Sequence, residues 1–172
     1  MTTPILLQTI LLIDNDAAAA YDVRAEIAAA GGDSFDVEWV RQLSAGIACL
    51  GKKRIAAVLL ALSLPDSQGI ETFDKLFATA RDIPILVLGG KINGPLAKQA
   101  VAHGAQDYLM SNHLDGYSLT RALRNAIERK AVEDALYVEK ERAVVALDSI
   151  GDAVLSTDIF GNVPISIWLP RE

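Results

Sequence analysis

Apolar runs alternate with helical patterns along most of this chain, and this alternation constrains its fold more than any other feature. The run Ile55–Ala61 contains no polar residue and is followed by a loop that contains Leu64-Pro65-Asp66. A strand without polar positions is buried on both faces, which is typical of a parallel sheet covered by helices. We expect the other strands at residues 5–13, 35–40, 83–88 and 106–110, separated by helices at 17–30, 44–51, 70–80 and 94–103.

This pattern predicts an α/β domain over residues 5–130. Five βα units joined by right-handed crossovers give the flavodoxin-like (βα)5 fold, a doubly wound parallel sheet with strand order 2-1-3-4-5. In such a sheet, ligands bind at the edge formed by the carboxyl ends of the strands. Asp14 follows the first strand and Ala61 ends the third, so both are expected at that edge.

Four local patterns, in the same order along the chain, resemble the receiver domains of two-component response regulators. They are the acidic cluster Asp14-Asn15-Asp16, the loop Leu64-Pro65-Asp66, the stretch 83–90 and the run Ala100-Val101-Ala102-His103-Gly104-Ala105-Gln106-Asp107-Tyr108-Leu109. The resemblance implies an acceptor aspartate at the end of the third strand, and an acidic pair that helps this aspartate to hold Mg²⁺. It also implies a hydroxyl and a lysine that bind the phosphoryl group.

The chain departs from the receiver pattern at most of these chemical positions. The resemblance assigns the acidic pair to Asp14 and Asn15, the acceptor to Ala61, the hydroxyl to Gly89 and the lysine to Ser111. A methyl group cannot accept a phosphoryl group, and Mg²⁺ prefers several hard oxygen ligands. We therefore expect a degenerate pocket with no metal site, no cofactor, no aspartyl phosphorylation and no catalytic residue, so the chain is not an enzyme.

Three neighbouring residues have competing interpretations. Asp16 is expected to cap the following helix rather than to bind a metal. Asp66 is interpreted as a turn residue rather than a displaced acceptor. Asp14 and Asp66 are nevertheless the candidate acceptors of an alternative hypothesis, a phosphorelay receiver with a non-standard acceptor. Tyr108 matches the aromatic switch residue of receivers; with Gly89 in place of its usual partner we expect a fixed ring, whose direction the sequence leaves open.

Composition excludes several classes of function. A net charge of −6 argues against direct binding of nucleic acid, whose phosphates repel an acidic chain. The single cysteine, Cys49, is expected to be a buried, unreactive thiol in a reducing cytoplasm. No basic leader and no long apolar run is present, so we expect no signal peptide and no contact with a membrane. His103 and His113 are expected on the surface rather than as metal ligands.

The last helical pattern is longer than a receiver needs. No glycine or proline occurs from Ser118 to Ile150. Two heptad positions are mostly apolar; one holds Leu119, Ala126, Leu147 and Val154, and the other holds Ala122, Leu136, Ala143 and Ile150. Arg129, Glu133 and Lys140 interrupt this seam. We expect a coiled-coil linker over residues 131–150 that pairs two copies, rather than a lone solvated helix.

Residues 148–163 resemble the opening of a PAS sensor domain, whereas residues 164–172 do not continue it. The segment 151–172 is therefore interpreted as a partial PAS-like start or a disordered tail, from a longer protein or a truncated gene. The combined hypothesis is a cytoplasmic pseudo-receiver, a receiver fold that signals without phosphorylation and binds protein partners. It is expected to form a homodimer through the receiver surface, the C-terminal helix or both. Its order of domains implies a downstream histidine kinase or cyclic-di-GMP enzyme. A flavin or nucleotide binder is disfavoured because residues 88–91 lack the spacing of a phosphate loop.

Overall fold

The computed structural model describes residues 7–30, 35–89, 94–110 and 115–149. The chain divides into two compact units, residues 1–130 and 131–172. Ser111, His113 and the PAS-like segment 151–172 lie outside the described residues.

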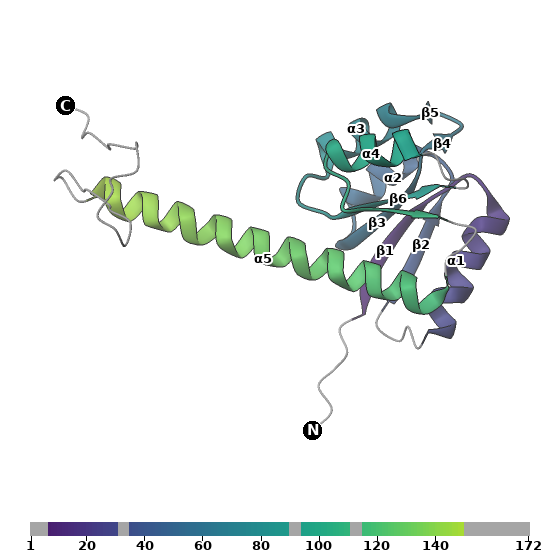
Figure 1. Ribbon diagram of the computed structural model, residues 1–172, viewed down its shortest axis with the longest axis horizontal. Coiled ribbons are helices and arrows are strands. Elements are labelled where there is room, and N and C mark those ends of the chain that lie inside the picture. Colours follow the sequence, from purple (N-terminus) through teal and green to yellow (C-terminus); the bar gives the residue numbers. More distant parts are fainter. Residues whose placement is uncertain (1–6, 31–34, 90–93, 111–114, 150–172) are drawn as a thin grey trace, which may run out of the picture. The chain divides into compact units, whose positions relative to one another are not determined.

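The first unit contains a five-stranded parallel sheet (Figure 1). Its strands are β1 (Gln8–Ile13), β2 (Phe35–Val40), β3 (Ile55–Ala61), β6 (Ile85–Gly89) and β7 (Asp107–Met110). They lie in the order β2-β1-β3-β6-β7, which confirms the predicted order 2-1-3-4-5. Two short strands, β4 (Ser63–Leu64) and β5 (Ser67–Gln68), form an antiparallel hairpin after β3, where the sequence predicts only a loop.

Helices cover both faces of the sheet, as the unbroken apolar strands require. The helices are α1 (Ala17–Ala29), α2 (Leu43–Leu50), α3 (Ile70–Thr79), α4 (Gly94–Ala102) and α5 (Gly116–Ser149). Leu60 of β3 is buried with Phe73 and Leu76 of α3 on one face. Leu59 is buried on the other face with Val23 of α1 and Leu123 of α5. Alternate residues of β3 therefore enter two separate hydrophobic cores.

Several strand and helix boundaries differ from the prediction. Leu7 precedes β1, which begins at Gln8. β6 begins at Ile85, after Pro84, and extends to Gly89. Proline has no N–H to donate to a neighbouring strand, although the Pro84 carbonyl still accepts from the amide of Val58 at 2.9 Å. These shifts leave the carboxyl edge of the sheet as predicted.

The start of α2 is capped from a distant loop. The sequence predicts Ser44 as its N-cap, but α2 begins at Leu43, and Gln42 makes no side-chain capping bond. The carboxylate of Asp66 instead accepts hydrogen bonds from the amides of Leu43 and Ser44, both at 2.9 Å. These amides have no partner within the helix, so an acceptor from another loop replaces the local cap.

Helix α5 uses its first turns to cover the sheet of the first unit. Leu119, Leu123 and Ala126 are buried in the same core as α1. Leu119 and Ala126 also belong to the heptad seam expected from the sequence, so this part of the seam is occupied by the protein's own sheet. Residues 131–145 of the second unit are all exposed. Among the described residues, no helix is both long enough and apolar enough to cross a bilayer.

Candidate functional site

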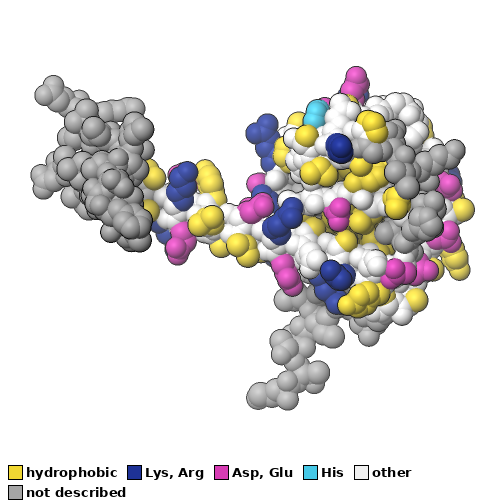
Figure 2. Space-filling model, in the orientation of Figure 1, with side chains coloured by type: hydrophobic (Ala, Val, Ile, Leu, Met, Phe, Trp, Pro, Cys, Tyr) yellow, Lys and Arg dark blue, Asp and Glu magenta, His cyan; other side chains and the backbone are white. Residues whose placement is uncertain are grey.

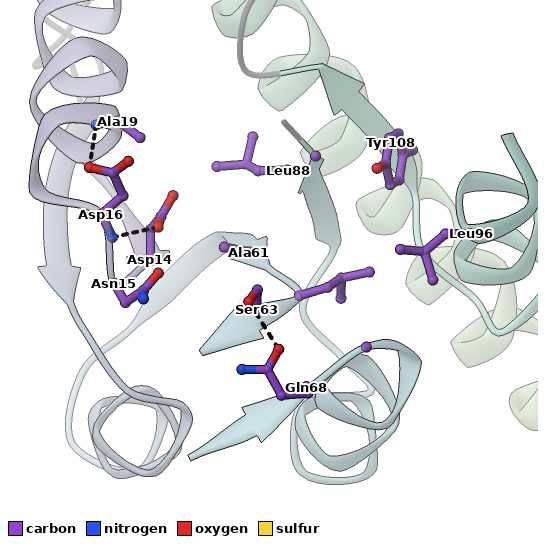
Figure 3. A pocket seen from close by; sticks show the side chains of 13 residues that line it. Asp14, Asn15, Asp16, Ala19, Ala61, Ser63, Gln68, Leu88, Leu96 and Tyr108 are labelled. Atoms are coloured by element: carbon purple, nitrogen blue, oxygen red, sulfur yellow. Dashed lines mark hydrogen bonds between the residues drawn. The ribbon is translucent and has the colours of Figure 1, made fainter. Parts of the chain in front are cut away.

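A pocket of about 420 Å³ lies at the carboxyl edge of the sheet (Figure 3). It is enclosed by the ends of β1, β3 and β6, the hairpin β4–β5, and side chains from α4 and β7. Its described lining residues are Asp14, Asn15, Asp16, Ala19, Ala61, Leu62, Ser63, Gln68, Gly69, Leu88, Gly89, Leu96 and Tyr108. The pocket therefore brings together every predicted site residue that the structure describes, apart from Asp66.

Asp14 is the one acidic side chain that is buried at this edge. It is only 8% exposed, and its Oδ1 accepts a hydrogen bond from the amide of Asp16 at 2.9 Å. Its main chain is fixed as well, because its N–H donates to the carbonyl of Val40 and its carbonyl accepts from Nε1 of Trp39. Burial raises the pKa of the Asp14 carboxyl above its usual value, and the Asp16 hydrogen bond opposes this shift. The surroundings of Asp14 therefore disfavour its charged form relative to a carboxyl in water.

Asp16 has the predicted capping role. Its carboxylate accepts hydrogen bonds from the amides of Ala18 at 2.9 Å and Ala19 at 3.4 Å, at the start of α1. The backbone of Asp16 is extended, as N-cap residues require. Asn15, between the two aspartates, is exposed and contributes an amide rather than a second charge. The acidic cluster thus divides into one buried carboxylate and one capping carboxylate.

Tyr108 points into the pocket and covers Gly89. A Cβ atom added to Gly89 would lie 1.8 Å from the Oη atom of Tyr108 and 2.3 Å from its Cζ atom. The space that a threonine or serine side chain would need at position 89 is therefore filled by the phenol. The sequence alone could not give this direction, because it depends on the empty volume at Gly89 and Ala61.

Ala61 and the hairpin form the middle of the pocket between the acidic and apolar sides (Figure 3). Its methyl group is partly buried at the end of β3. Ser63 Oγ donates to Gln68 Oε1 at 2.9 Å, and the side-chain Nε2 of Gln68 donates to the carbonyl of Leu64 at 2.6 Å. The sequence did not identify Gln68 or Leu96 as pocket residues, because a short hairpin and an unpatterned helix gave no signal for them.

Asp66 lies in the turn between β4 and β5, as interpreted from the sequence, but it does not line the pocket. The hydrogen bond from the amide of Ser44, with that from Leu43, holds the pKa of its carboxyl below its usual value. Its role as a cap for α2 could not be found from local sequence, since its partners are 22 and 23 residues away.

The described donors do not fit the Mg²⁺ ion that receivers use. Mg²⁺ requires near-octahedral oxygen ligands, and proteins usually supply one or two carboxylates while waters and phosphates complete the shell. Here Asp14 is the one buried carboxylate, Asp16 caps a helix, and Ala61 has no oxygen in its side chain. Within the described part of the chain, no group of three His, Cys, Asp or Glu residues is placed to hold a metal.

Two residues outside the pocket complete the comparison with the predictions. His103 is exposed, and its Nδ1 lies 2.7 Å from Oδ1 of Asp74. Cys49 is only partly buried, which corrects the expectation of a buried thiol. Burial and the nearby charge of Glu38 still raise the pKa of Cys49, so the thiol form is favoured.

The fold and the edge pocket define a protein of the receiver class, and comparison with known proteins gives the family. The response regulator receiver domain profile matches residues 10–113, and the chain belongs to this family. Receiver domains of this kind are signalling modules of two-component systems that interact with protein partners. The family is thus established by the profile match.

The chain is similar to the transcriptional regulatory protein QseB of Haemophilus influenzae, with 29% identity over 100 residues. The match covers 58% of this chain and 44% of that regulator, so it spans less than half of the relative's length. Two solved structures share the fold. The first is a CheY-like receiver domain protein of Methanospirillum hungatei JF-1, with a TM-score of 0.63 and 20% identity, covering 74% of this chain and 98% of the other. The second is the receiver domain of an HD domain-containing protein of Pseudomonas fluorescens Pf-5, with a TM-score of 0.67 and 20% identity, covering 78% of this chain and 97% of the other.

Proposed function

We propose that this chain is a pseudo-receiver, a receiver-fold signalling module that works without aspartyl phosphorylation. In this proposal it binds protein partners, pairs with a second copy, and passes a conformational state through α5 to a downstream sensor or output domain in the cytoplasm. The order receiver, helix and PAS-like segment supports an output such as a histidine kinase or a cyclic-di-GMP enzyme.

One observation carries the proposal: Ala61 ends β3 and lines the pocket, at the position that the receiver pattern assigns to the acceptor. Transfer of a phosphoryl group needs a nucleophile at this point, and a methyl group has no lone pair to offer. The Tyr108 phenol also fills the hydroxyl position at Gly89. Both changes remove groups that would contact a phosphoryl group, so loss of the reaction is the simplest account of this pocket.

A receiver that uses another acceptor is the competing function, with Asp14 or Asp66 as the nucleophile. Asp66 is a poor candidate because its carboxylate is held by two amides of α2 and does not line the pocket. Asp14 lines the pocket, but it is only 8% exposed and its Oδ1 already accepts a hydrogen bond from the amide of Asp16, so its carboxylate is less accessible to a phosphoryl donor than that of an open acceptor.

Incubation of the full chain with acetyl phosphate and Mg²⁺, followed by intact-mass measurement, tests the proposal. We expect no added phosphoryl mass, while an active receiver treated alongside gains it. Beryllofluoride with Mg²⁺ should leave the backbone amide shifts of the strand ends unchanged. A gain of phosphoryl mass by the parent chain would overturn the proposal. If only one of the variants Asp14→Asn and Asp66→Asn loses this gain, the residue replaced in that variant is the acceptor.

The Ala61→Asp variant tests how far the pocket has departed from a working receiver. We expect it to remain unphosphorylated, because Asn15 supplies no second charge and Gly89 supplies no hydroxyl. Phosphorylation of this variant would mean that the loss of the acceptor is the only defect.

A further inference from the structure

The edge pocket has two chemically different sides (Figure 3). Asp14 and Asp16 lie on one side, from the end of β1 and the start of α1. Leu88, Leu96 and Tyr108 lie on the other side, from β6, α4 and β7. Ala61 is between them and, with its short side chain, leaves the space open. The result is a cavity with an anionic wall and an apolar wall.

The anionic wall contains a carboxylate that the protein satisfies only in part. Asp14 is 8% exposed, and its Oδ1 accepts the amide of Asp16. The hydrogen bonds of the described residues include none to its Oδ2, and this oxygen is open to the pocket, because no fully buried side-chain oxygen among these residues lacks a partner. No lysine, arginine or histidine is among the described residues that line the pocket. A mostly buried carboxylate that none of the described lining residues pairs with a cation is costly, and a cation placed beside it would offset part of that cost.

From this geometry we infer that the pocket is a binding site for a small organic cation, an ammonium group carried on a short apolar or aromatic body. The ammonium group donates to Oδ2 of Asp14, with the charge of Asp16 close by, and the body lies against Leu88, Leu96 and the Tyr108 ring. A volume of about 420 Å³ is in the range of small-molecule sites. A phosphoryl group or other anion is disfavoured by the same carboxylates.

This inference deepens the proposed function, since it gives the pseudo-receiver an input in place of phosphorylation. It rests on that function only in assigning the pocket no phosphoryl chemistry. Binding of the cation at the meeting point of β1, β3, β6 and β7 would favour one arrangement of these strand ends over another, which is how a ligand shifts a conformational equilibrium.

The experiment is a titration of the full chain, followed by backbone amide chemical shifts, with three probes of matched size. The probes are phenethylammonium, neutral phenethyl alcohol and anionic hydrocinnamate. We expect saturable shifts at the amides of Asp16, Ala19 and Gly89 with phenethylammonium. Affinity for the alcohol and the carboxylate should be at least about tenfold weaker, because a charge-assisted hydrogen bond is lost.

Two variants and one control locate the site. Asp14→Asn keeps an oxygen for the Asp16 amide but removes the charge, and should weaken phenethylammonium binding by about tenfold. Ala61→Leu fills the cavity and should abolish binding. Asp22→Asn removes an exposed carboxylate of α1 outside the pocket and should bind as the parent chain does.

Equal binding of all three probes, or no saturable binding of the ammonium, would overturn the inference. So would ammonium binding that Asp14→Asn leaves unchanged. These results are independent of the acetyl phosphate experiment: a chain that resists phosphorylation yet binds no cation keeps the proposed function and loses this inference. A chain that is phosphorylated loses the proposed function whatever the titration shows.

Discussion

At the residue scale, Gly89 and Tyr108 have to be considered as a pair. The backbone at Gly89 has no positive φ, so a side chain would be compatible with the strand conformation there. The obstacle is the Tyr108 phenol, which fills the position of the missing Cβ. The glycine is therefore explained by a neighbour's ring and not by backbone conformation, and the inward direction of the Tyr108 ring, which the sequence left open, depends on this contact.

A double-mutant cycle tests this pair. In the Tyr108→Ala background, Gly89→Ala should stabilise the protein by about 0.5–1 kcal/mol, as replacement of a strand glycine does. With Tyr108 present, the same change forces the ring out and should be destabilising, giving a coupling energy of at least about 1 kcal/mol. Urea denaturation of the four proteins measures the coupling. Effects that add within about 0.5 kcal/mol would mean that the ring does not occupy this space.

The capping of α2 by Asp66 gives a pH-dependent prediction at the same scale. Asp66→Ala should cost about 1 kcal/mol at neutral pH, the usual value of an N-cap, while Asp82→Ala, in an exposed turn, should cost little. The pKa of Asp66 is lowered in the folded state. The contribution of the Asp66 carboxylate to the free energy of unfolding is therefore complete at a pH above the usual pKa of 3.8. This contribution is lost as the pH falls through the lower pKa of the folded state.

Thermal denaturation of Asp66→Ala and the parent chain over a range of pH measures this effect. The two unfolding curves should approach each other in acid and separate towards neutral pH. A gap that is constant with pH would show that the carboxylate charge has no part in the cap.

At the element scale, sequence patterns predicted the elements but not the contacts between them. Unbroken apolar runs such as Ile55–Ala61 gave the strands, their order and the edge where the site lies. The cap on α2 could not be predicted, because it comes from a residue more than 20 positions away. The direction of Tyr108 depends on a cavity that exists only after folding. Likewise, the heptad pattern of α5 could not reveal that Leu119 is already buried against the sheet.

The contact between α1 and the start of α5 gives an element-scale prediction. The amide of Gly116 donates to Oε2 of Glu26 at 2.7 Å, and a Cβ atom at Gly116 would lie 2.1 Å from the main-chain carbonyl oxygen of Glu26. A backbone atom cannot rotate away as a side chain does. Gly116→Ala should therefore push the two helices apart and cost about 2–3 kcal/mol, the upper range for overpacking.

Gly51→Ala is the matched control, because the nearest atom to its added Cβ would be 3.9 Å away. Its free energy of unfolding should change by less than about 1 kcal/mol. Equal effects of the two substitutions in urea denaturation would contradict the close approach of the helices at Gly116.

At the scale of the whole molecule, α5 begins in the first compact unit and continues into the second, and the side chains of its two parts differ in exposure. Up to Ala126 its inner face is buried in the core of the first unit. Beyond Lys130 the described side chains are exposed, including Val132 at 68% and Leu136 at 69%. Figure 2 shows hydrophobic side chains interspersed with charged ones along this part of the helix. A helix that exposes such residues in water gains stability when it pairs with another helix.

Truncation after residue 130 separates the two roles of α5. The fragment 1–130 should keep the unfolding temperature of the first unit, because no side chain of its described core comes from beyond residue 130. Under the proposed dimerisation, the full chain should sediment as a dimer and the fragment as a monomer. Leu136→Gln, on the expected seam, should shift the full chain towards monomer, whereas Arg142→Gln, off that seam, should not. A fragment that dimerises as well as the full chain would assign the pairing surface to the first unit. A full chain that stays monomeric at high concentration would remove the pairing surface altogether. In either case α5 would transmit its state as a single helix.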